Sequence, residues 1–98
     1  AEIGKFRIEV KGSQHRIMGN GHYGWQFLIH RHGKGDHSPS DFHALLCYGT
    51  DDNCVGCFLI PSCRIGTNII GIYGNDPRSY RGKCRGYFEA WDVLSGAV

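Results

Sequence analysis

Glu9 and Lys11 stand two positions apart in a stretch of alternating apolar and polar residues near the start of the chain. Side chains on a β-strand alternate between its faces, so we expect Glu9 and Lys11 on one face and Ile8 and Val10 on the other. A carboxylate on a strand can bind a divalent cation, and a neighbouring ammonium can stabilise the charge of an attacked phosphate. The same spacing also describes an exposed ion pair, which is a common surface feature.

A second group of chemically useful residues is basic and lies in the last quarter of the chain. It comprises Arg78, Arg81, Lys83 and Arg85. Such a cluster can contact nucleic-acid phosphates, but a solvated loop is often basic without binding anything. The formal net charge of +2 does not by itself indicate a nucleic-acid-binding protein, so both interpretations stay open.

The five cysteines lie mostly in or beside apolar stretches, which is typical of free thiols in a reducing compartment rather than of a disulfide framework. Cys54 and Cys57 have the separation of half a zinc site, and Cys47, Cys63 and the histidines are candidates for completing it. A structural zinc site normally has a second well-spaced pair of ligands. We therefore do not expect zinc.

Histidines form one further polar group. His30 and His32 would share a face of a strand, and His37 and His43 follow them along the chain. Imidazoles placed in this way can chelate a metal or lie near phosphate, but nothing in the sequence fixes a third ligand. We expect a solvated strand end and loop here.

The length of 98 residues and the hydrophobic content of 41% predict a single domain, residues 1–98, with one core. No apolar run approaches the roughly 20 residues that span a bilayer, and the first residues lack the apolar part of a secretory signal. The sequence therefore predicts a protein of the cytoplasm that does not enter a membrane.

These residues must be positioned by strands, because apolar runs bounded by turn-forming residues recur along the chain. The predicted strands are Phe6–Lys11, Gly24–Arg31, Phe42–Tyr48, Val55–Ile60 and Asn68–Tyr73. The run at Phe42–Tyr48 is nearly continuous in apolar character, as for a strand covered on both faces. Gly, Pro, Asn, Asp and Ser fill the connections, of which the first runs from Gly12 to Gly21. Short connections favour antiparallel neighbours in the order of a meander.

Helical spacing of apolar residues occurs only at the end of the chain, over Gly86–Leu94. The predicted fold class is thus α+β and rich in β-structure, with a largely antiparallel sheet of about five strands and a C-terminal helix. One short helix leaves a face of such a sheet poorly covered, and an uncovered apolar face usually finds a partner. We expect either a homodimer or an additional N-terminal segment that covers this face.

In the order of its elements the chain resembles the later part of a PD-(D/E)XK nuclease-like domain, a truncated restriction-endonuclease-like core. The resemblance is greatest to the small endonuclease-like proteins of mobile elements and restriction systems. Phe6–Gln14 resembles the central strand of that family, with Glu9 and Lys11 at the Glu-x-Lys positions. The stretches that resemble the later strands and the closing helix of the family are Trp25–His30, Asp41–Phe42, Phe58–Ser62 and Phe88–Leu94.

The resemblance implies a Mg²⁺-dependent endonuclease that hydrolyses DNA phosphodiester bonds. Glu9 would be a metal ligand together with a second carboxylate and the backbone carbonyl of Val10. Lys11 would orient the attacking water or stabilise the pentavalent oxyanion, and Gln14 would assist positioning by a hydrogen bond. Arg78, Arg81, Lys83 and Arg85 would then contact DNA.

Two elements that complete the family's site, an acidic helix and a Pro-Asp motif, are not found before Glu9. The only upstream acid is Glu2, and the sequence predicts no hairpin of useful length at that point. We therefore expect either the C-terminal part of a longer nuclease or a stand-alone relative that has lost the chemistry. The alternative function is a non-catalytic β-rich binding or assembly module that homodimerises, with Glu9 and Lys11 as a surface pair.

Overall fold

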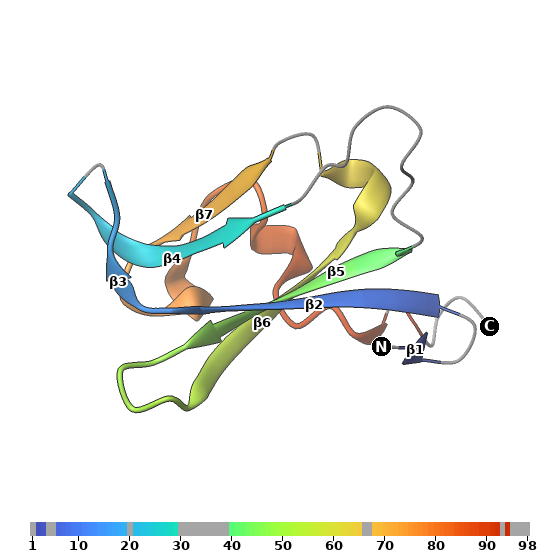
Figure 1. Cartoon of the computed structure of the whole chain (residues 1–98), viewed down its shortest axis with the longest axis horizontal. Coiled ribbons are helices and arrows are strands. Elements are labelled where there is room, and N and C mark those ends of the chain that lie inside the picture. Colours follow the sequence, from blue (N-terminus) through green and yellow to red (C-terminus); the bar gives the residue numbers. More distant parts are fainter. Residues whose placement is uncertain are drawn as a thin grey trace.

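The computed structural model of the chain describes residues 2–3, 6–19, 21–29, 40–65, 68–92 and 94. These residues form a β-rich fold of seven strands and three short 3₁₀ turns (Figure 1). The strands are β1 (Glu2–Ile3), β2 (Phe6–Gln14), β3 (Arg16–Ile17), β4 (Tyr23–Leu28), β5 (Phe42–Tyr48), β6 (Cys54–Pro61) and β7 (Ile69–Tyr73). The 3₁₀ turns are η1 (Ser62–Arg64), η2 (Pro77–Ser79) and η3 (Arg85–Tyr87). Strands β2, β4, β5, β6 and β7 confirm the five predicted ones.

The strands are divided between two sheets, so the predicted single sheet of about five strands is not confirmed. One sheet has the order β1-β2-β5-β6 and the other the order β3-β4-β7. Figure 1 shows β4 and β7 as a layer above β2, β5 and β6. Only His15 separates β2 from β3, so the chain passes from one sheet to the other at this corner. The sequence shows no break there, because an extended chain that bends keeps its strand-like pattern.

The pairing of β2 with β5 is parallel, whereas the other described strand pairs are antiparallel. The prediction of a meander is therefore wrong at this point, although the fold is mostly antiparallel. Strands β3 and β4 lie between β2 and β5 along the chain but belong to the second sheet. The chain between β2 and β5 is therefore long enough for the connection that two parallel strands require.

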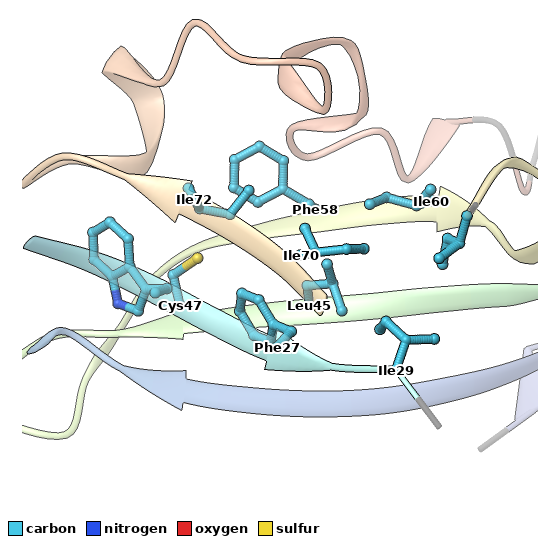
Figure 2. Packing of buried hydrophobic residues seen from close by; sticks show 10 residues of the cluster. Phe27, Ile29, Leu45, Cys47, Phe58, Ile60, Ile70 and Ile72 are labelled. Atoms are coloured by element: carbon cyan, nitrogen blue, oxygen red, sulfur yellow. The ribbon is translucent and has the colours of Figure 1, made fainter. Parts of the chain in front are cut away.

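The main core lies between the two sheets, and Figure 2 shows its side chains from both of them. Its members are Trp25, Phe27, Ile29, Leu45, Cys47, Phe58, Ile60, Ile65, Ile70 and Ile72. Leu45 and Cys47 of β5 belong to this core, while Phe42 and Ala44 belong to a second buried cluster with Ile8, Cys57 and Leu59. Strand β5 is thus covered on both faces, as its continuous apolar run predicts.

Strand β2 continues beyond Gly12, where a connection is predicted. The ring of Tyr48 lies so close that a Cβ at Gly12 would stand 2.9 Å from its Cε2 atom. Glycine at position 12 therefore leaves room for the ring of Tyr48 against β2. The backbone N–H of His15 and the indole N–H of Trp25 both donate to the carbonyl of Tyr48, at 3.0 and 2.8 Å. These bonds hold the corner between the sheets.

The predicted helix over Gly86–Leu94 is not confirmed. Residues Arg85–Tyr87 form the 3₁₀ turn η3, and Phe88 then forms an isolated bridge with Phe58 of β6. Glu89, with a φ of 50°, donates its N–H to the carbonyl of Cys57 and accepts the N–H of Cys57 at its carboxylate. Phe88 and Glu89 therefore pair with the free edge of β6 instead of forming a helix. The helical spacing of the aromatic residues does not predict this pairing.

At the other end of the chain, β1 pairs with the start of β2 through Glu2 opposite Arg7 and Ile3 opposite Phe6. The sequence predicts no hairpin of useful length there, and the strand that does form has two residues. Within the described part of the chain, none of the helical segments has the length and apolar character needed to cross a membrane. All five cysteines are free thiols.

Candidate functional site

Glu9 and Lys11 lie in the middle of β2, and their backbone positions pair with His43 and Leu45 of β5. Because partners in a sheet share a face, both side chains lie on the face that carries His43. Glu9 is exposed and Lys11 is half-buried. No ion pair joins the two side chains in the part of the chain that the structure describes. The predicted common face is therefore confirmed, whereas the surface ion pair is not observed.

His43 is the buried member of this group, with 6% of its surface exposed. Its Nδ1 atom is hydrogen-bonded to Ser62 Oγ at 2.8 Å. Burial lowers the pKa of His43 from 6.5, with an opposing effect from Glu9 and a smaller lowering effect from Lys11. His43 is therefore mainly neutral at pH 7, and Nε2 is the ring nitrogen that is not bonded to Ser62.

The register that places His43 opposite Glu9 is fixed by Asp41, directly before β5. Its N–H donates to the carbonyl of Arg7 at 2.8 Å, and its carboxylate accepts the N–H of Arg7 at 2.9 Å. The carbonyl of Asp41 accepts the N–H of Ser62 at 2.9 Å. Asp41 thus ties the start of β5 to both neighbouring segments and brings Ser62 to the imidazole of His43.

Gln14, the third predicted catalytic residue, is not brought to this group. It lies at the far end of β2, paired with Tyr48. Its side-chain amide donates to the carboxylate of Asp52 in the turn between β5 and β6. Gln14 is placed to fasten that turn rather than to contact a ligand near Glu9.

The basic cluster Arg78–Arg85 lies in the segment that contains η2 and η3, and this segment packs against strand β6. A Cβ at Gly56 would stand 2.9 Å from the Cβ of Pro77, the ring of Tyr80 contacts that of Phe58 edge-on, and Lys83 shares a pocket with Ile60. All four predicted DNA contacts are exposed, and Arg78 lies 3.8 Å from the carboxylate of Asp76. Strand β5 lies between β2, which carries Glu9, and β6, which η2 and η3 contact.

The buried thiols do not offer a zinc-binding environment. Burial raises the pKa of Cys47 and of Cys57 to about 12, which keeps both thiols protonated, whereas zinc binds the thiolate. Among the described residues, no three His, Cys, Asp or Glu side chains are close enough together to hold a metal ion. His30, His32 and His37 lie outside the described residues.

Neither the pairing of His43 with Glu9 nor the role of Ser62 is predicted from the sequence. One signal for His43 was present, since it is the only polar residue in the run Phe42–Tyr48 apart from the terminal tyrosine. A histidine in a strand that is buried on both faces needs a hydrogen-bond partner, which Ser62 supplies. Its position opposite Glu9 depends on the parallel pairing of β2 with β5, which the sequence does not predict.

Glu9, Lys11 and His43 together place a carboxylate, an ammonium and a neutral imidazole on one face of two adjacent strands. Carboxylates and imidazoles are groups that bind cations, and an ammonium can stabilise an anion. In comparisons with models of known protein families, with curated proteins and with solved structures, the chain has no match.

Proposed function

We propose that the chain carries the Glu-x-Lys part of a metal-dependent nuclease site that acts on DNA phosphodiester bonds. The observation that carries the proposal is the position of His43, opposite Glu9 and on the same face as Lys11. A structural ion pair needs only two opposite charges. A neutral imidazole beside a carboxylate supplies a second metal ligand.

Glu9 and the Nε2 atom of His43 would hold the cation in this site. Imidazole suits Mn²⁺ better than Mg²⁺, and a single carboxylate binds Mg²⁺ weakly because that ion gives up its water reluctantly. When bound, a divalent cation lowers the pKa of a coordinated water and offsets negative charge at the phosphate. Lys11 stabilises the charge that develops on the attacked phosphate. Ser62 holds the imidazole in place through Nδ1.

Plasmid cleavage in the presence of Mn²⁺ or Mg²⁺ tests this proposal. If the site is complete in this chain, it should nick plasmid DNA, faster with Mn²⁺, and the rate should fall about a hundredfold or more in Lys11→Met and in Glu9→Gln. Val10→Thr is the matched control, because Val10 lies on the same strand and pairs with Ala44 on the opposite face. Absence of cleavage by the unmodified chain with either metal would contradict catalysis by this chain alone.

A measurement of metal binding tests the proposed ligands independently of DNA cleavage. Titration with Mn²⁺, followed by electron paramagnetic resonance, should show one bound ion that is lost in Glu9→Gln and retained in Val10→Thr. Equal Mn²⁺ affinity of both variants would contradict the role of Glu9 as a ligand.

A second candidate function, homodimeric assembly, is favoured by the outer face of the sheet β3-β4-β7. Leu28 of β4 and Ile69 of β7 pair in register there and are 57% and 47% exposed, and Tyr73 on the same face is 49% exposed. A second copy of the chain could bury this face. Sedimentation equilibrium should then show a dimer that Leu28→Glu dissociates and Val10→Glu, on the other sheet, does not; a monomer at all concentrations would remove this candidate.

A further inference from the structure

A pocket of about 510 Å³ opens where β6 ends and β7 begins. Its lining comes from β6, from η1 and the residue after it, from β7, and from the segment around η3. The lining residues are Ile60, Arg64, Ile65, Ile70, Lys83, Cys84 and Tyr87. The volume is in the range of pockets that enclose a small organic group.

The floor of the pocket is apolar and belongs to the main core. Ile60, Ile65 and Ile70 are only 2%, 5% and 7% exposed and belong to the main core, which Figure 2 shows for Ile60 and Ile70. Tyr87 is half-buried and packs against the same core. The pocket therefore offers an aliphatic surface together with an aromatic side chain.

Both charged residues in the lining are cations. Arg64 ends η1, and Lys83 lies in the turn before η3, so two separate segments supply them; both are exposed. No carboxylate is among the described lining residues. Burial raises the pKa of the Cys84 thiol, which adds no negative charge at neutral pH. The rim of the pocket thus favours an anionic group.

The pocket lies at the same end of the fold as the Glu9–His43 pair. His43 is the register partner of Ile60, and Ile60 lines the pocket. Glu9, His43 and Ile60 thus form one row across β2, β5 and β6. Neighbouring strands are about 4.8 Å apart, so the row spans roughly 10 Å, which is a distance that a few nucleotides of a single strand can bridge.

We infer that this pocket binds an unpaired nucleotide of a DNA strand, with the base on the isoleucine floor beside Tyr87 and a phosphate between Arg64 and Lys83. This inference rests on the proposed function for the choice of DNA as the ligand. An apolar surface with an aromatic side chain, bordered by cations, is the arrangement by which proteins bind single strands without reading sequence. Arg81 and Arg85, which flank Lys83 along the chain, extend the positive charge beyond the pocket, as a polymer of phosphates requires.

Binding measurements in EDTA test the inference without any dependence on cleavage. Fluorescence anisotropy would compare three labelled ligands: a blunt duplex, the same duplex with a short unpaired tail, and one whose tail carries abasic nucleotides. We expect the tailed duplex to bind about tenfold more tightly than the other two. In the double variant Arg64→Gln and Lys83→Gln this preference disappears, and the dependence of log Kd on log salt becomes weaker by about one unit for each cation.

Arg16→Gln is the matched control, since Arg16 is an exposed cation on β3, which contributes no residue to the pocket lining, and should leave the preference intact. Circular dichroism of each variant verifies its fold. Equal binding of the three ligands by the unmodified chain would overturn the inference, even if the chain cleaves DNA. Saturable binding of decanoate that tailed DNA does not displace would also overturn it, because it would assign the pocket to a small apolar anion.

Discussion

Glu9 and His43 lie directly opposite each other on the parallel strands β2 and β5. The imidazole is buried and held by Ser62, whereas the carboxylate is exposed, so the pair joins a fixed imidazole to an accessible carboxylate. Lys11 is the next residue on the same face of β2. The chemistry proposed for this chain depends on this arrangement of side chains. The effects of the arrangement on stability can be measured without any reaction.

The stability of the protein should fall on acidification through the environment of His43. Its pKa is lowered from 6.5 in the folded state, mainly by burial, so between pH 6.5 and the lower folded-state pKa the unfolded chain takes up a proton that the folded chain does not. The free energy of unfolding should therefore decrease as the pH falls below 6.5. Above pH 6.5, His43 should not contribute to the change of this free energy with pH. Urea titrations at several pH values should show a smaller decrease in His43→Gln than in the unmodified chain. An identical pH dependence in the two proteins would refute the assignment, and His22→Gln in the exposed turn before β4 is the control.

Packing of the C-terminal segment, residues 77–89, on β6 should depend on Gly56. A Cβ at this position would stand 2.8 Å from Cε1 of Phe88 and 2.9 Å from Cβ of Pro77, so Gly56→Ala should lower the free energy of unfolding by about 1–3 kcal/mol. Gly86→Ala is the matched control, because a Cβ there meets nothing within 4 Å. It should be neutral or stabilise by up to about 1 kcal/mol. Equal effects of the two substitutions in chemical denaturation would show that the segment does not pack as described.

Gln14 should contribute to stability and not to cleavage. Its amide holds Asp52 at the surface, so Gln14→Ala should cost about 1 kcal/mol or less in chemical denaturation. Any DNA cleavage that requires Glu9 should proceed at an unchanged rate in this variant. A large loss of activity with unchanged stability would place Gln14 in the site after all.

The exposed cations of the C-terminal segment should bind DNA through phosphates alone. Substituting both Arg81 and Arg85 by Gln should weaken binding of a blunt duplex at low salt and lower the slope of log Kd against log salt by about one unit for each residue. Arg78→Gln should have a smaller effect, because Arg78 lies beside the carboxylate of Asp76. Anisotropy measurements over a range of salt concentrations would decide this, and unchanged slopes would exclude the cluster as a DNA contact.

The sequence predicted the positions of the strands well for a simple physical reason. Alternation and continuous apolar runs reflect which faces of a strand are buried, and this is a local property of the residues. Phe42–Tyr48 illustrates it, because the predicted and observed bounds of this strand agree and both of its faces are covered. The same local pattern was wrong at Gly12, which was predicted to begin a connection but lies within β2 beside the ring of Tyr48. It was also wrong over Gly86–Leu94, where Phe88 pairs with β6 although the apolar residues have helical spacing.

By itself the sequence determined a β-rich chain with Glu9 and Lys11 on one face of a strand, because alternation depends only on neighbouring residues. Only the tertiary structure decided that β5 lies parallel to β2, that His43 therefore stands opposite Glu9, and that Gln14 belongs elsewhere. It also brought Arg64 and Lys83, which are far apart in the chain, to one pocket. These relationships arise from the bend at His15 and from hydrogen bonds between distant segments, such as those of Asp41, and no local pattern of residues records them.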